Sequence, residues 1–209
     1  GGMCYSQKKY AESIQYSSKA LQLARALNDT RGISLSYSML GLTYLDKKQY
    51  PEALQNFSAG LEIDTEVDDR EGMAIANENI GSVYSHLEKY DEAVKRDSIA
   101  FALYTENGDK MGIAQIHLNS GGIDMIRKNY KAAEVHFLKS IALAKEMDNL
   151  VIIKDASERL SVMYEIMGNL SESLKYYREY TNAKDSLFNE SNVKKIVELE
   201  MNYDFDKKE

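Results

Sequence analysis

The sequence predicts an all-α protein, a solenoid of antiparallel helix pairs, from two observations. The first is a period of 40 residues, marked by a tyrosine that leucine replaces in the fifth copy: Tyr10, Tyr50, Tyr90, Tyr130 and Leu170. Copies of one small unit stack into a solenoid, in which each unit contacts its neighbours. The second is composition, because helix formers are abundant and proline occurs once in 209 residues. No segment suggests a strand.

Each copy contains two amphipathic segments, and the second segment begins at the mark. The first segments carry a small residue at one matching position, in Gly41, Gly81, Gly121 and Ser161. The second segments carry another, in Ala53, Ala93, Ala133 and Ser173. Small side chains at such positions let two helices approach closely. The connections are short, so the two helices of a copy should be antiparallel.

Turn residues mark the boundaries between copies, again 40 apart: Asn28 and Asp29, Asp68 and Asp69, Gly108 and Asp109, and Asp148 and Asn149. Such residues accept left-handed or turn conformations and cap the next helix. We therefore expect first helices at about 31–46, 71–86, 111–126 and 151–166. We expect second helices at about 7–27, 50–66, 90–106, 130–147 and 170–188.

The period also predicts the organisation of the chain. The repeat array should occupy residues 1–185, as a truncated first unit at 1–28 and further units at 31–68, 71–108, 111–148 and 151–185. Gly1 corresponds to Gly41 of the next copy, so most of the first helix of its unit is missing. We interpret the chain as a fragment of a longer protein. A C-terminal capping or linker helix is expected at 186–209.

Composition argues against several classes of function. The net charge of -7 disfavours nucleic-acid binding, because proteins of that class concentrate Lys and Arg on one face. No apolar run approaches the roughly 20 residues that a membrane span needs. The single cysteine, Cys4, excludes an internal disulfide, and the three histidines show no metal-ligand spacing. We predict no catalytic, cofactor-binding or metal site, and therefore no enzyme.

The copy at 34–67 resembles the tetratricopeptide repeat family in its variety of about 40 residues. The packing residues that carry the resemblance are Tyr37, Leu40, Gly41, Tyr44, Tyr50, Ala53, Phe57 and Gly60. The resemblance implies a right-handed superhelix that binds proteins or peptides without catalysis. Some copies depart from the family pattern: Asn77 and His117 replace the first aromatic, Asp124 replaces a tyrosine, and Asp97 stands at the position of Phe57.

The resemblance further implies that the first helices line a concave groove. Its candidate partner-binding residues are Ser38, Leu42, Leu45, Glu78, Asn79, Ser82, His86, Gln115, Leu118, Asn119, Met125, Asp155, Glu158, Arg159, Val162 and Glu165. Relatives that hold the C-terminal carboxylate of chaperones use Lys, Asn, Asn, Lys and Arg at five positions, which here are Ser38, Leu42, Ser82, Gln115 and Asn119, without a cation. We therefore expect a protein or peptide partner with basic or apolar anchors. The convex face and the terminal helix remain alternatives.

The segment after the last repeat has a narrow apolar stripe at Val193, Ile196, Val197, Glu200 and Tyr203. It predicts either a helix that caps the final repeat or a coiled-coil linker. Residues 184–190 and 195–203 resemble the exit of Bacteroidetes-type tetratricopeptide sensors, which leads to a membrane span and then a histidine kinase, a cyclase or a helix-turn-helix domain. A homodimer through this helix or through the exposed N-terminal end is a further possibility.

Two hypotheses of function follow. The first is the sensory or scaffolding part of a bacterial signalling protein, which would be periplasmic if the sensor resemblance holds and cytoplasmic otherwise. The alternative is a free-standing scaffold or adaptor that resembles spindle-orientation or kinesin-light-chain repeat proteins. A third, a resemblance to the phosphatase and peptide-sensing regulators of Bacillus, requires an N-terminal three-helix bundle that these residues do not contain.

Overall fold

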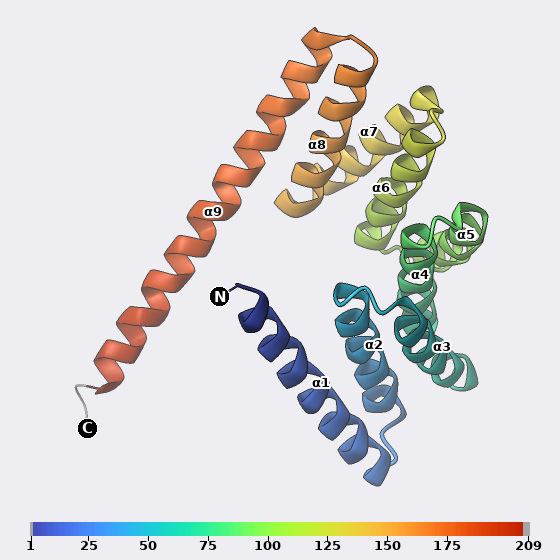
Figure 1. Cartoon of the computed structure of the whole chain (residues 1–209), viewed down its shortest axis with the longest axis vertical. Coiled ribbons are helices and arrows are strands. Elements are labelled where there is room, and N and C mark those ends of the chain that lie inside the picture. Colours follow the sequence, from blue (N-terminus) through green and yellow to red (C-terminus); the bar gives the residue numbers. More distant parts are fainter. Residues whose placement is uncertain (1, 207–209) are drawn as a thin grey trace. The chain divides into compact units, whose positions relative to one another are not determined.

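The computed structural model describes the backbone of residues 2–206 and the side chains of residues 9–193, and within this range the chain consists of helices joined by short turns (Figure 1). The helices are α1 Gly2–Ala26, α2 Thr30–Asp46, α3 Tyr50–Glu66, α4 Arg70–His86, α5 Tyr90–Asn107, α6 Lys110–Ile126, α7 Tyr130–Glu146, α8 Leu150–Ile166 and α9 Leu170–Asp206. The all-α prediction is confirmed. From α2 to α8 the predicted helix ends agree with the observed ends to within one residue.

The chain divides into two compact units, Gly1–Asn119 and Ser120–Glu209, and the boundary falls inside α6. In the first unit each helix from α1 to α4 packs against the next helix along the chain. In the second unit α7 packs against α8, and α8 packs against α9. This neighbour-to-neighbour packing is the arrangement expected for a repeat array.

The first helices begin at side-chain caps. In each cap a side-chain oxygen accepts a hydrogen bond from the backbone N–H three residues later. The capping residues are Asp29 and Asp69, at 3.0 Å, and Asp109 and Asn149, at 3.1 Å. Such a cap satisfies one of the backbone donors that the first turn of a helix leaves without a partner. The predicted role of these residues is confirmed.

Every turn between helices contains a residue with left-handed backbone. Between copies this residue is Asn28, Asp68, Gly108 or Asp148, with φ of 53°, 52°, 68° and 52°. Within copies it is Lys48, Glu88, Lys128 or Gly168, with φ of 59°, 59°, 61° and 75°. The first set was predicted from residue type. The second set was not, because Lys and Glu carry no signal for this conformation.

The small residues of the first helices lie against the second helices, as predicted. A Cβ atom on Gly41 would lie 2.5 Å from the ring of Phe57, and one on Gly121 would lie 2.7 Å from the ring of Phe137. Both rings are fully buried. A larger residue at either glycine would push the helix pair apart, so the glycines are needed for close packing.

Both ends of the array differ from the prediction. α9 is a single helix of 37 residues that continues to Asp206, without a break near residue 185 or 188. The capping or linker helix expected at 186–209 is continuous with the last repeat helix as far as Asp206. At the other end α1 begins at Gly2 and passes through position 8, which corresponds to the turn residue Lys48.

Candidate functional site

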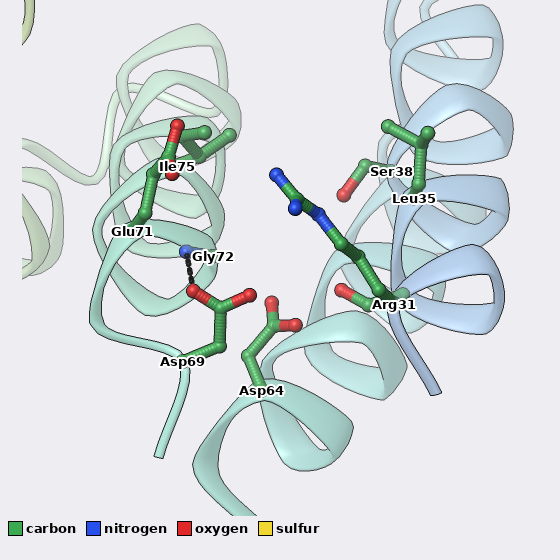
Figure 2. Close-up of a pocket in the computed structure, with 9 residues that line it drawn as sticks. Arg31, Leu35, Ser38, Asp64, Asp69, Glu71, Gly72 and Ile75 are labelled. Atoms are coloured by element: carbon green, nitrogen blue, oxygen red, sulfur yellow. Dashed lines mark hydrogen bonds between the residues drawn. The ribbon is translucent and has the colours of Figure 1, made fainter. Parts of the chain in front are cut away.

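In the first unit, one pocket lies between α2 and α4, and Ser38 is the predicted groove residue that lines it. Leu35 and Ser38 of α2 and Ile75 of α4 form part of its wall, and Figure 2 shows them on the two facing helices. The cavity has a volume of about 230 Å³. The pocket therefore lies between two successive first helices, and the predicted α4 residues Glu78, Asn79, Ser82 and His86 are not among its lining residues.

α2 presents an apolar stripe beside this pocket. Leu35, Met39 and Leu42 are 63%, 48% and 41% exposed, and their spacing of four and three residues places them on one side of the helix. Met39 was missing from the predicted set, although its equivalents in the other copies, Asn79, Asn119 and Arg159, were included. Leu45 was included, but it packs against the core cluster that contains Phe57.

Two of the candidates on α4, Glu78 and His86, contact other side chains of the protein. Glu78 is half-buried and accepts a hydrogen bond from the Tyr104 hydroxyl at 2.6 Å. Burial raises the pKa of the Glu78 carboxyl. Asn79 and Ser82 are half-buried, and His86 is exposed with its ring stacked on Tyr50 at 5.8 Å between centroids.

The candidates on α6 contribute less accessible surface than the prediction assumed. Gln115 donates a hydrogen bond to Asn119 at 3.0 Å, which ties the two amides together on the helix. Leu118 is only 2% exposed, so its side chain packs in the interior and offers no binding surface. The repeat pattern suggested an exposed position because Ser38 and Glu78 occupy it in earlier copies.

The remaining candidates belong to the second unit. Met125 and Asp155 are half-buried, whereas Glu158, Arg159, Val162 and Glu165 are exposed. Asp155 pairs with Lys154 at 2.9 Å, and the Arg159 guanidinium lies over Gly122, where a Cβ would collide with it. Although the residue as a whole is exposed, desolvation of its guanidinium group lowers the pKa of Arg159. Each unit thus has its own set of candidates.

The pocket in the first unit contains a carboxylate that the repeat pattern does not predict. Asp64, near the end of α3, is 3% exposed and faces the pocket from below (Figure 2). A Cβ on Gly72 would lie 2.5 Å from its carboxyl carbon, so the carboxyl group fits against a glycine of α4. Burial raises the pKa of Asp64, a hydrogen bond with Ser34 opposes this rise, and the charge of Asp69 adds to it.

Sequence comparison within the chain contained the signal that identifies Asp64. The equivalent positions in the first, third and fourth copies are Ala24, Tyr104 and Ala144, and all three are buried. Tyr104 lies against Gly112 in the way that Asp64 lies against Gly72. The copy at 31–68 is thus distinguished by a carboxylate at a position where its neighbours have apolar or aromatic side chains.

A second buried carboxylate lies in the core and not in the pocket. Asp97 takes the place of Phe57 and Phe137, is 3% exposed, and has no hydrogen-bond partner for either carboxyl oxygen among the described residues. Burial, and secondarily the charge of Glu78, raises its pKa to about 7. We assign no binding role to Asp97.

The described part of the chain contains neither a candidate metal-binding group nor a candidate membrane-spanning helix. There, no three side chains of His, Cys, Asp or Glu come together as a group that could hold a metal ion. Among the described helices, none has the length and apolar character needed to cross a membrane.

Comparison with known proteins identifies the family. The model of the tetratricopeptide repeat family matches residues 1–66 and 72–146. This chain belongs to that family. Repeats of this family are generally non-catalytic units that bind other proteins, and the fold is an all-α solenoid. Comparison with curated proteins returned no match.

Solved structures share the fold at low sequence identity. BtubC (BKLC) from P. vanneervenii has a TM-score of 0.69 at 15% identity, over 87% of this chain and 75% of that one. The apo form of RapI has a TM-score of 0.63 at 18% identity, over 88% of this chain and 80% of that one. Aspartyl phosphate phosphatase F from Bacillus subtilis has a TM-score of 0.67 at 14% identity, over 86% of this chain and 56% of that one. Identities this low support a shared fold alone.

Proposed function

We propose that this chain is a non-catalytic protein-binding module, and that the first unit binds its partner through the groove faces of α2 and α4. The observation that carries the proposal is the exposed apolar stripe of Leu35, Met39 and Leu42 next to an acidic pocket. Covering apolar surface is favourable by about 25 cal/mol for each Å² removed from water. A contiguous stripe of this kind is typical of a surface that a partner covers.

The proposal can be tested by selecting binders from a library of random peptides. The native chain, a Leu42→Asp variant and a Val94→Asp variant would be used as baits. Val94 is a matched control, because it is 39% exposed but lies on α5, a second helix. We expect a motif with apolar anchors that is enriched on the native chain and on the control and is lost on Leu42→Asp. Equal enrichment on all three baits would refute the proposed surface.

We also propose that the module belongs to a larger bacterial signalling protein, as its sensory or scaffolding part. The continuous helix α9 supports this context, because its 37 residues extend well beyond the 17 of its partner α8. The alternative is a free-standing scaffold or adaptor. Determining the gene sequence on both sides of these residues separates the two, since a membrane span followed by an output domain is expected in the first case only.

A homodimer through α9 is a further proposal, which rests on two exposed apolar residues in its second half. Phe188 and Val193 are 66% and 59% exposed. Sedimentation equilibrium of the full chain should show a dimer that the double variant Phe188→Asp, Val193→Asp dissociates. A monomer at all concentrations would contradict the proposal.

A further inference from the structure

The pocket between α2 and α4 combines a buried carboxylate with an excess of negative charge. Asp64, Asp69 and Glu71 line it, and Arg31 is the single cation among its lining residues. Asp69 caps α4 through the backbone N–H of Gly72, at 3.0 Å, and its charge adds to that of Asp64. The lining therefore carries three acidic side chains against one basic side chain, and this balance favours a cation over an anion.

The pocket walls suit a long aliphatic side chain. Leu35 of α2 and Ile75 of α4 lie on its two sides, and both are partly exposed. Lys and Arg side chains bury their methylene groups along apolar surface and present their charge at the tip. An apolar wall that leads to a carboxylate matches this division of the side chain.

We propose that this pocket binds a lysine or arginine side chain of the protein partner, with the cationic head at Asp64 and the methylenes between Leu35 and Ile75. The inference rests on the proposed function, because it assigns one anchor of the partner to one place on the same surface. It gives a role to Asp64, which stands where the first, third and fourth copies have Ala24, Tyr104 and Ala144. The hydrogen bond with Ser34 offsets only part of the cost of burying the Asp64 carboxylate, and a bound cation would offset more of it.

Arg31 is the intramolecular competitor for this role. Its side chain extends from α2 into the space between α2 and α4 (Figure 2). In the described part of the chain no ion pair joins it to Asp64, Asp69 or Glu71. Its positive charge opposes the entry of a second cation, so removal of this charge should strengthen binding.

The direct test uses n-butylammonium, which has the aliphatic chain and the charge of a lysine side chain. Backbone amide shifts of the full chain would be followed by NMR at constant ionic strength, with n-butanol and butyrate as neutral and anionic controls. We expect saturable shifts at Ser34, Gly72 and Ile75 with a dissociation constant in roughly the millimolar range, as is usual for so small a ligand. Butyrate should produce none.

Substitutions define the groups responsible. Asp64→Asn keeps the side-chain volume and should weaken binding by about tenfold or more. Asp69→Asn retains a helix cap and removes a charge, so it should weaken binding by a smaller factor. Arg31→Gln should strengthen binding. The matched control is Asp109→Asn, the same change at the equivalent cap one copy later, which should weaken binding less than Asp69→Asn because Asp109 does not line this pocket. If Asp64→Asn does not fold, Asp69→Asn and Glu71→Gln carry the test.

The outcomes separate this inference from the proposed function. Suppose that peptide selection yields an apolar motif lost on Leu42→Asp, but n-butylammonium gives no saturable shift, or a basic position in the motif survives Asp64→Asn. The pocket inference is then wrong, and the binding surface stands. Suppose instead that n-butylammonium binds at Asp64, but the selected peptides are enriched equally on the native chain and on Leu42→Asp. The surface is then wrong, and the cation pocket stands.

Discussion

At the scale of single residues, the copies differ most where a polar side chain occupies an aromatic site. Asn77 is satisfied there, because it donates to the Met73 carbonyl at 2.8 Å and accepts from Arg96 at 3.1 Å. His117 packs its ring against Phe101 at 5.6 Å between centroids. Asp97 differs from both, because its buried carboxylate has no hydrogen-bond partner among the described residues. It is therefore a weak point of the α4–α5 pair.

Replacement of Asp97 by phenylalanine should stabilise the protein. The ring would face Gly81 as the rings of Phe57 and Phe137 face Gly41 and Gly121. Burial of the ring and loss of the unsatisfied carboxylate should raise the unfolding free energy by about 2 kcal/mol. Urea unfolding at pH 7.5 measures the change, with Asp97→Asn as the control that removes only the charge. A lower midpoint for Asp97→Phe would show that the ring does not fit.

Stability should also depend on pH through Asp97. Its pKa is raised from 3.8 to about 7, so the folded protein keeps a proton that the unfolded chain releases. The contribution of Asp97 to the unfolding free energy is therefore greatest below about pH 4, falls as pH rises to about 7, and is level above that. In urea unfolding, the stability of Asp97→Asn relative to the native chain should rise across this interval. A constant difference would mean that Asp97 does not titrate there.

At the scale of elements, the helices are specified by local signals, and this explains which boundaries the sequence predicts. Asp and Asn caps and the tyrosine marks repeat every 40 residues, so the starts of α2 to α8 follow from residue type. The end expected at residue 188 was inferred from the loss of the period. No Gly or Pro interrupts residues 170–206, and the helix therefore continues.

The within-copy turns leave a stabilising change available. Lys48, Glu88 and Lys128 adopt left-handed backbone, which costs a residue with a Cβ roughly 1 kcal/mol relative to glycine, whereas the fifth copy has Gly168 at this position. Glu88→Gly should raise the unfolding free energy by up to about 1 kcal/mol. The reverse change, Gly168→Ala, should lower the unfolding free energy by a similar amount. Thermal unfolding of both variants and the native chain measures the two changes. A loss of stability in Glu88→Gly would show that its side chain contributes more than the backbone strain costs.

At the scale of the whole molecule, the family pattern identified which surface to examine but not its distinguishing residues. The predicted groove included Leu42 and Ser38 because they occupy family positions. It omitted Asp64, because this residue lies on a second helix, and it included Leu118, which is buried because the copies differ in packing. The specific features of a repeat surface come from differences between copies, and a shared pattern does not predict them.

The net charge of -7 has a consequence for any basic partner. Binding of a selected peptide that contains lysine should weaken severalfold as ionic strength rises from about 0.05 to 0.5 M, because salt screens exposed charges. The same peptide with norleucine in place of lysine should show little dependence. Isothermal titration calorimetry at several salt concentrations measures both. Equal salt dependence of the two peptides would argue against a charged anchor.

The uninterrupted helix α9 gives the molecule a mechanical property. At 1.5 Å per residue, the 37 residues from Leu170 to Asp206 span about 55 Å. A tilt of about 5° at the end that packs on α8 would displace the far end by about 5 Å if the helix stays straight. Such a helix would convert a small repacking of the last repeat into a movement of several Å at its far end.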